Sequence, residues 1–232
     1  MNKIAAWVVH VFTATGILFA FLAMIAMWEG KAEPALYWLA AAIVVDSVDG
    51  TFARAFRIKE TLPIVDGATL DNLIDYITFT LLPLFWAYLF LDIPASVCII
   101  AAMASSLGFS RTDAKTEDNY FLGFPSYWNI VVFYFYILDL PAIWSSAILL
   151  MLAVMVFIPL KWIYPSRTSE LKTTTLALST IYCVLIGYML FKMTQTPDWV
   201  VMLSLFYPIY YIGASVYFGN YKSMAKTTAD SG

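Results

Sequence analysis

Long apolar runs alternate with short polar connections along almost the whole chain. A helix needs about 20 mostly apolar residues to cross a bilayer, and eight segments approach this length and composition. The fifth is short and could merge with or tilt against the sixth. We predict an all-α, polytopic membrane helical bundle of about eight transmembrane helices, formed by a single domain over residues 1–232. The eight predicted spans are Val8–Trp28, Ala35–Phe56, Ala68–Leu91, Pro94–Ser110, Pro125–Leu138, Ala142–Trp162, Thr173–Phe191 and Trp199–Phe218.

Four aspartates interrupt the apolar pattern of the second and third predicted spans. An ionised carboxylate inside a bilayer costs at least about 2.5 kcal/mol. Residues three or four apart share one face of a helix. Asp46 and Asp49 therefore lie on one face of the second span, and Asp71 and Asp75 lie on one face of the third. We expect the four carboxylates to meet in a cleft, because the two ends that carry them are joined by a polar connection containing Arg57, Lys59, Glu60 and Pro63.

Composition and charge give the predicted bundle an orientation. The chain is 62% hydrophobic and only 12% charged, with a mean hydropathy of +0.78. Of its 13 Lys and Arg residues, all but Lys31 and Lys192 fall on the side of the membrane that holds the N-terminus. Positively charged loops face the cytoplasm, so we predict that both termini and the acidic cleft are cytoplasmic. Cys98 and Cys183 fall within predicted spans, and we expect no disulfide between them.

The acidic cleft has the chemistry of a divalent metal site. Four like charges so close together cannot all stay ionised unaided, and Mg²⁺ or Mn²⁺ prefers oxygen ligands. Two ions suit four carboxylates, and such a pair is a recurring clamp for phosphoryl transfer. An isolated aspartate near a helix end is usually a solvated cap. Here four occur together, and the same faces carry small residues and a guanidinium that can bind phosphate, namely Gly50, Ala53, Gly67 and Arg54.

This pattern resembles the signature of the CDP-alcohol phosphotransferases, which are integral membrane enzymes of phospholipid synthesis. The gap of 12 residues between the arginine and the second glycine resembles the bacterial phosphatidylcholine synthase branch of that family. The eight predicted spans and the stretch Phe121–Asn129 also resemble that branch. The matching pattern is Asp46-x2-Asp49-Gly50-x2-Ala53-Arg54-x12-Gly67-x3-Asp71-x3-Asp75.

The resemblance implies transfer of a phosphatidyl group from CDP-diacylglycerol to choline, giving phosphatidylcholine and CMP. It implies a homodimer among the lipids of a bacterial inner membrane, with its active site facing the cytoplasm and no nucleic-acid partner. Asp75 would be the general base. Two Mn²⁺ or Mg²⁺ ions would be held by Asp46, Asp49, Asp71 and Asp75. The CDP-diacylglycerol site would be lined by Asp49, Gly50, Ala53, Arg54 and Gly67.

Two features bear on the acceptor alcohol. The predicted cytoplasmic loop Arg111–Asp118 holds two basic and three acidic residues, which suits a cationic acceptor better than an anionic one. Proteins hold a quaternary ammonium with aromatic faces, and aromatic residues follow this loop closely. The alternative is that these rings form an interfacial aromatic belt. The candidate choline contacts are Tyr120, Phe124, Tyr127 and Trp128.

Two other functions remain open at this point. A divalent-cation transporter would also carry acids inside the membrane, although it is expected to place them near mid-membrane and often shows a repeat. Within the enzyme class, the acceptor could be another alcohol, such as serine or inositol. His10 is the only histidine. A structural hydrogen bond is its simplest role, and contact with the nucleotide, together with Thr13 and Gly16, is the alternative.

Overall fold

The protein is a helical membrane protein. Its computed structural model describes residues 3–56, 61, 64–165 and 167–221. Within these, five helices are long and apolar enough to cross a membrane. The predicted connection carrying Arg57, Lys59, Glu60 and Pro63 lies outside the described residues, as do Lys222 and Lys226. The five helices are α1 (Lys3–Trp28), α2 (Ala32–Ala55), a third over Gly67–Phe90, a fourth over Lys172–Gln195 and a fifth over Asp198–Asn220.

Three shorter apolar helices occupy the other predicted spans among the described residues. They are α6 (Ala95–Phe109), α7 (Trp128–Ile137) and α8 (Ala142–Met155). At 1.5 Å per residue, each is shorter than a hydrocarbon core of about 30 Å. The five long apolar helices confirm a helical membrane protein. The count of eight spans and the cytoplasmic placement of the termini stay predictions.

The all-α prediction fits the chain, and the structure adds one small sheet to it. Strand β1 (Tyr120–Leu122) pairs antiparallel with β2 (Lys161–Ile163), and Phe121 lies opposite Trp162. The two strands are far apart in the sequence, and each has only three residues. A pairing this short and this distant leaves no periodic pattern in the sequence, so only the folded chain reveals it.

The chain divides into two compact units. Unit 1 comprises residues 1–102 and 127–134, and unit 2 comprises residues 103–126 and 135–232. These units are regions of close packing, and the single domain over residues 1–232 stays a prediction. All four aspartates of the predicted acidic cleft belong to unit 1.

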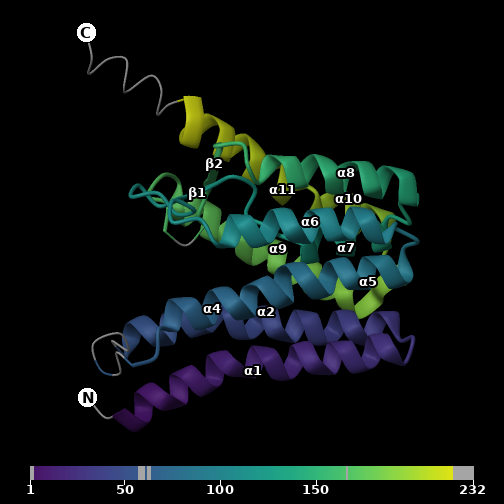
Figure 1. Ribbon diagram of the computed structural model, residues 1–232. Coiled ribbons are helices and arrows are strands. Elements are labelled where there is room, and N and C mark those ends of the chain that lie inside the picture. The colour runs from purple at the N-terminus through teal and green to yellow at the C-terminus, as the bar shows by residue number, and fades with distance from the viewer. Residues whose placement is uncertain (1–2, 57–60, 62–63, 166, 222–232) are drawn as a thin grey trace. The chain divides into compact units, whose positions relative to one another are not determined.

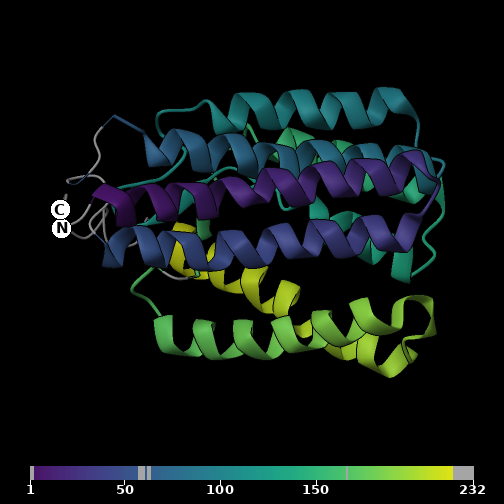
Figure 2. The same cartoon turned by 90° about the horizontal axis from the view of Figure 1, so that it is seen from below.

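Unit 1 is built on close packing of its first three long helices. Figure 1 shows α1 and α2 running antiparallel, and Figure 2 shows α1 lying beside both α2 and α4 (Gly67–Asp75). Small residues allow this approach. Ala23 and Ala35 are fully buried, and a Cβ added at Gly16 would stand only 2.6 Å from Ile74 Cγ2. This packing places the C-terminal end of α2 and the N-terminal end of α4 beside the N-terminal half of α1.

The third long helix changes its winding directly after Asp75. Helix α4 continues into a π-helical segment, η1 (Tyr76–Leu81), and then into α5 (Leu82–Phe90). Pro83 lacks an N–H donor, and its ring clashes with the carbonyl four residues earlier in a regular helix. The wider π turn ends two residues before this proline. Single π turns inside α-helices are frequent at functional sites.

Besides α8, unit 2 contains the short sheet and further helical segments. They are α9 (Lys172–Lys192), η2 (Met193–Gln195), α10 (Asp198–Ser204), α11 (Phe206–Ala214) and η3 (Ser215–Tyr221). Strand β2 is tied to the last two by hydrogen bonds, from the Tyr211 hydroxyl to the Ile163 carbonyl at 2.9 Å and from the Ile163 amide to Ser215 Oγ at 3.0 Å. Gly123 follows β1 at a φ of +83°, where a Cβ would stand 2.2 Å from the Val156 carbonyl oxygen. Only glycine fits there.

Candidate active site

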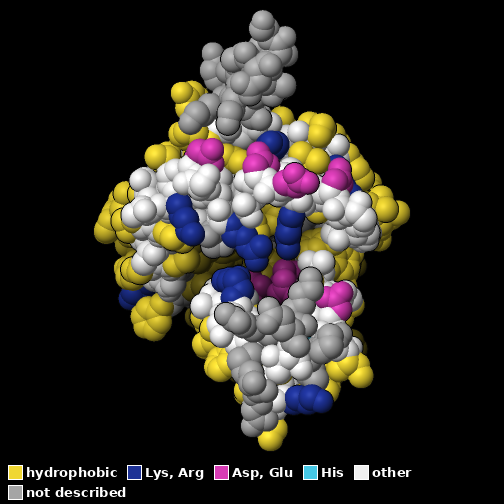
Figure 3. All heavy atoms as spheres, turned by 90° about the vertical axis from the view of Figure 1, so that its left-hand side faces the viewer, with side chains coloured by type: hydrophobic (Ala, Val, Ile, Leu, Met, Phe, Trp, Pro, Cys, Tyr) yellow, Lys and Arg dark blue, Asp and Glu magenta, His cyan; other side chains and the backbone are white. Residues whose placement is uncertain are grey.

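Three carboxylates converge at the end of unit 1 where α2 ends and α4 begins. Oxygen atoms of Asp46, Asp49 and Asp71 all lie within 4.8 Å of one another. Asp49 is buried, and the other two are partly buried. Figure 3 looks onto the end of the molecule at which α1 begins, where acidic and basic side chains come to the surface. Asp46 and Asp49 of α2 and Asp71 of α4 therefore lie together, as their helical spacing in the sequence predicted.

The fourth aspartate joins this cluster through a hydrogen bond. The Asp75 carboxyl hydrogen-bonds the Asp46 carboxyl. Asp49 is held from the other side, because the Thr13 hydroxyl of α1 donates to its carboxylate. Helix α1 therefore takes part in the site through a residue that the sequence pattern does not mark as a ligand.

The electrostatics of the cluster suit a divalent cation. Two ionised carboxylates 4.8 Å apart repel by about 3.5 kcal/mol at an effective dielectric constant of about 20. Hard divalent cations prefer carboxylate oxygens, and Mg²⁺ and Mn²⁺ accept water or phosphate oxygens as the remaining ligands. The donor set of Asp46, Asp49 and Asp71 fits such an ion. Metal binding by these residues stays a prediction.

Arg54 occupies the space that a glycine leaves beside it. A Cβ at Gly50 would stand 3.3 Å from Arg54 Nη1, and Arg54 Nη2 donates to Thr51 Oγ1 at 3.2 Å. The residue is exposed in the last turn of α2, where a cation interacts favourably with the helix dipole. Its guanidinium remains accessible to an anionic group.

The other two small residues of the motif face α1. Ala53 packs against the buried pair Ala6 and Val9, so its small size also serves helix packing. A Cβ at Gly67 would stand 3.3 Å from His10 Cε1. Directly before Gly67, Asp66 caps α4 by accepting hydrogen bonds from the amides of Ala68 and Thr69. An aspartate one residue before a helix is a recognisable capping signal, although the predicted site did not include it.

The candidate choline residues are divided between the two units. Tyr120 and Phe124 belong to unit 2, and Tyr127 and Trp128 belong to unit 1. Trp128 is fully buried, whereas Tyr127 is partly exposed. Tyr127 is therefore the more accessible ring of the two in unit 1.

Tyr120 is already engaged with polar groups of unit 2. The Lys161 ammonium lies 5.5 Å from the centre of its ring, and its hydroxyl hydrogen-bonds Glu170 Oε2 at 3.2 Å. Burial, and then the negative charge of Glu170, raise the pKa of the Tyr120 hydroxyl. Lys161 also binds Asp118 at 2.6 Å. This ring therefore holds a cation supplied by the chain itself.

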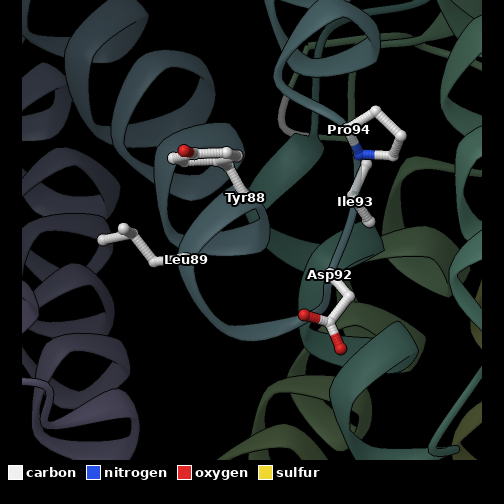
Figure 4. Close-up of a pocket in the computed structure, with 5 residues that line it drawn as sticks. All are labelled: Tyr88, Leu89, Asp92, Ile93 and Pro94. Carbon is white, nitrogen blue, oxygen red and sulfur yellow. The ribbon is translucent and has the colours of Figure 1, made fainter.

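A separate depression lies at the far end of the third long helix. It has a volume of about 390 Å³ and is lined by Tyr88, Leu89, Asp92, Ile93 and Pro94 (Figure 4). Asp71 lies about 25 Å away along the helix axis, at 1.5 Å for each of the intervening residues. Asp92 contributes the one carboxylate of this lining, so the depression lacks the converging acids of the site.

Comparisons with known proteins agree on one group of relatives. No family model matches the chain. A phosphatidylcholine synthase from Borreliella burgdorferi is 38% identical over 200 residues, covering 84% of this chain and 86% of the relative. Similar proteins of the same name come from Pseudomonas aeruginosa, 35% identical with 94% and 90% covered, and from Legionella pneumophila, 34% identical with 98% and 94% covered.

Proposed function

The chain belongs to the phosphatidylcholine synthase family, and on this premise we propose that it transfers the phosphatidyl group of CDP-diacylglycerol to choline. Membership makes the protein a phosphatidyltransferase enzyme. The observation that carries the proposed reaction is the convergence of Asp46, Asp49 and Asp71, with Asp75 hydrogen-bonded to the group. The products would be phosphatidylcholine and CMP.

Asp75 is the proposed general base. The choline hydroxyl oxygen would attack the phosphorus that carries the diacylglycerol, and its proton would pass to the Asp75 carboxylate. The bond from this phosphorus to the oxygen that bridges to CMP would break, and CMP would leave with that oxygen. A positioned carboxylate can take this proton at the moment of attack. The contact between Asp75 and Asp46 supports this role, because it holds the base beside the acidic cluster.

Asp46, Asp49, Asp71 and Asp75 are the proposed ligands of two Mn²⁺ or Mg²⁺ ions. Such ions would neutralise the charge of the diphosphate and stabilise the CMP leaving group. Arg54 would bind a phosphate oxygen through its guanidinium. Gly50 leaves room for that guanidinium. Asp49, Ala53 and Gly67 complete the proposed CDP-diacylglycerol site.

Choline is the proposed acceptor because the names of the relatives point to it and the chain offers aromatic and acidic groups. Unit 2 shows how this sequence holds a cation, since Lys161 contacts both the face of Tyr120 and the carboxylate of Asp118. A quaternary ammonium is bound by the same kinds of group. Tyr120, Phe124, Tyr127 and Trp128 stay the proposed choline contacts, and of the two rings in unit 1, Tyr127 is the accessible one.

A divalent-cation transporter is the rival function, and the name that the relatives share argues against it. The position of the acids does not separate the two functions. Asp71 lies about one turn from the start of the third long helix, whereas Asp46 and Asp75 lie closer to the middle of their helices, which is where transporters bind their ions.

The decisive experiment measures CMP release from CDP-diacylglycerol by purified protein. The protein would be stripped with a chelator and then supplied with Mn²⁺, Mg²⁺ or Ca²⁺ and one of several alcohols. We expect release only with Mn²⁺ or Mg²⁺ and far faster with choline than with serine, inositol or glycerol 3-phosphate. Full activity without any divalent ion would refute the metal site. Equal rates with choline and glycerol 3-phosphate would refute the acceptor and leave the transferase assignment intact.

The protein is proposed to act as a homodimer in the bacterial inner membrane with the site facing the cytoplasm. The excess of Lys and Arg on one side of the membrane supports this orientation. A membrane-impermeant thiol reagent would test it, because a cysteine introduced at Thr112 should react only in inverted vesicles. Reaction in intact spheroplasts would reverse the orientation.

A further inference from the structure

His10 carries a buried nitrogen that no described group satisfies. The residue is 6% exposed, and its Nε2 has no hydrogen-bond partner. Buried polar atoms in folded proteins almost always have partners, and leaving one without a partner is destabilising. The unpaired nitrogen of His10 therefore calls for an explanation. A hydrogen bond to a bound ligand would provide one.

The surroundings of His10 connect it with the acidic cluster. Its ring edge at Cε1 lies 3.3 Å from the position of a Cβ at Gly67, and Gly67 begins the helix that carries Asp71. Thr13, three residues further along the same face of α1, donates a hydrogen bond to Asp49. His10 therefore lies within about one helical turn of the cluster, on the side where α4 starts.

We propose that His10 Nε2 hydrogen-bonds the nucleoside of the donor substrate, its ribose or its cytosine. This inference rests on the proposed function, which places CDP-diacylglycerol in this site. In that function the four carboxylates, with the ions that they would hold, bind the diphosphate. A group about one turn away from them meets the next part of the nucleotide, which is the nucleoside. Gly67 has no side chain, so the nucleoside can approach the ring edge of His10 there.

An anion at the start of α4 is a weaker explanation of the same geometry. The amides of Ala68 and Thr69, at the start of α4, already donate hydrogen bonds to the Asp66 carboxylate, at 3.0 Å and 3.4 Å. A phosphate placed there would have to displace that carboxylate. A neutral, polar nucleoside meets no such competition.

The test is direct binding of CMP and of pyrophosphate to the full chain in detergent with Mn²⁺ present. His10→Phe keeps a ring of similar shape and removes both nitrogens. We expect it to weaken CMP binding roughly 10-fold, the size of one hydrogen bond to a buried group, and to leave pyrophosphate binding unchanged. Its melting temperature without ligand should equal or exceed that of the wild type, because the orphan nitrogen is gone. His10→Asn, which restores a polar group, should recover part of the CMP affinity.

Thr80→Val is the matched control. Thr80 Oγ1 is also buried without a partner in unit 1, in η1 and outside the proposed site, so this variant should bind CMP as the wild type does. If His10→Phe fails to fold, His10→Leu replaces it in the same measurements. Wild-type CMP affinity in the apolar variant would overturn the inference, and so would equal losses for CMP and pyrophosphate. Absence of CMP binding in the wild type would overturn the proposed function as well.

A comparison of CMP with dCMP separates the two nucleoside groups. If the ribose 2′-hydroxyl is the partner, dCMP should bind the wild type about as weakly as CMP binds His10→Phe, and the variant should not distinguish the two. If cytosine is the partner, the variant should weaken both nucleotides equally.

Discussion

Two groups of acidic side chains, one in each unit, are arranged in opposite ways. In unit 2, Asp118 lies 2.6 Å from the Lys161 ammonium, and Asp113 lies 2.7 Å from the Arg111 guanidinium. In unit 1, three aspartates lie within 4.8 Å of one another, and a fourth is hydrogen-bonded to one of them. Opposite charges stabilise a fold without outside help, although only modestly at a surface. Like charges become favourable only when a cation or a proton joins them. The paired charges of unit 2 therefore stabilise the fold by themselves, whereas the clustered aspartates of unit 1 are the proposed site of a cation.

The pairs of unit 2 have the titration behaviour of structural charges. The hydrogen bond from Arg111 lowers the pKa of the Asp113 carboxyl. Partial burial raises the pKa of the Asp118 carboxyl, but hydrogen bonds from Lys161 and Thr116 outweigh it and leave that pKa lowered. Both carboxylates therefore stay ionised with their cations beside them at neutral pH.

The largest effect should come from removing the proposed base. Asp75→Asn keeps the size of the side chain and can no longer accept the choline proton. We expect CMP release to fall by about 10²–10⁴-fold, which is the usual contribution of a general base, while CDP-diacylglycerol still binds. Turnover and binding would be measured on the same preparation. A variant with near wild-type turnover would show that another group takes the proton.

Next in size is the loss of a proposed metal ligand. Asp71→Asn should lower activity by more than about 100-fold, because even outer residues around metal sites contribute about 10–100-fold. Without divalent ions, the variant should melt at the same or a higher temperature than the wild type, since one repelling charge is gone. Mn²⁺ should raise the melting temperature of the wild type but not of the variant. Asp198→Asn, in the first turn of α10, is the control and should leave both quantities unchanged.

A smaller effect is expected at the one basic residue of the motif. Arg54→Lys keeps the charge but loses the planar guanidinium that can bind phosphate through two nitrogens. We expect the KM for CDP-diacylglycerol to rise roughly 10-fold, the size of one charged hydrogen bond, and turnover to slow. Steady-state kinetics at saturating choline would measure both. Unchanged kinetics in Arg54→Lys and Arg54→Ala would mean that the residue only stabilises the end of α2.

The acceptor site should respond more weakly still. Tyr127→Ala should raise the KM for choline about 5-fold, which corresponds to one cation–π contact of about 1 kcal/mol, with little change in affinity for CDP-diacylglycerol. Tyr127→Phe, which keeps the ring face, is the matched control and should behave as the wild type. Trp128 is a poorer choice because it is fully buried, so its replacement would also disturb packing. A rise in both KM values would point to general damage and not to a choline contact.

The smallest effect belongs to the paired charges of unit 2. Lys161→Met removes the cation beside Asp118 and should lower stability by no more than about 1 kcal/mol, as for other exposed pairs. The pKa of Asp118 is lowered in the folded chain, so the pair stabilises the fold above the carboxyl's unfolded pKa of about 3.9. This contribution is lost as the pH falls through the folded pKa. Thermal melting should therefore show a smaller difference between the two proteins near pH 3 than at neutral pH.

Several properties of this protein were determined by its sequence alone. The apolar runs predicted a helical membrane protein, because each span must be apolar over a fixed length. The pairs Asp46 and Asp49, and Asp71 and Asp75, were predicted to share helix faces from their spacing, since the period of a helix is a local property. The same residues carry the family pattern, and the relatives confirm that family.

Other properties were decided only by the tertiary structure. The contacts of Thr13 with Asp49 and of His10 with Gly67 depend on how closely α1 approaches α2 and α4, and this approach is set by small residues distributed over all three helices. The pairing of β1 with β2 joins residues about 40 positions apart. Such contacts leave no periodic mark in the sequence, because each depends on the packing of segments whose separation along the chain is arbitrary. Local periodicity could therefore place the acids on their helix faces, while packing alone could show which residues of α1 lie against them.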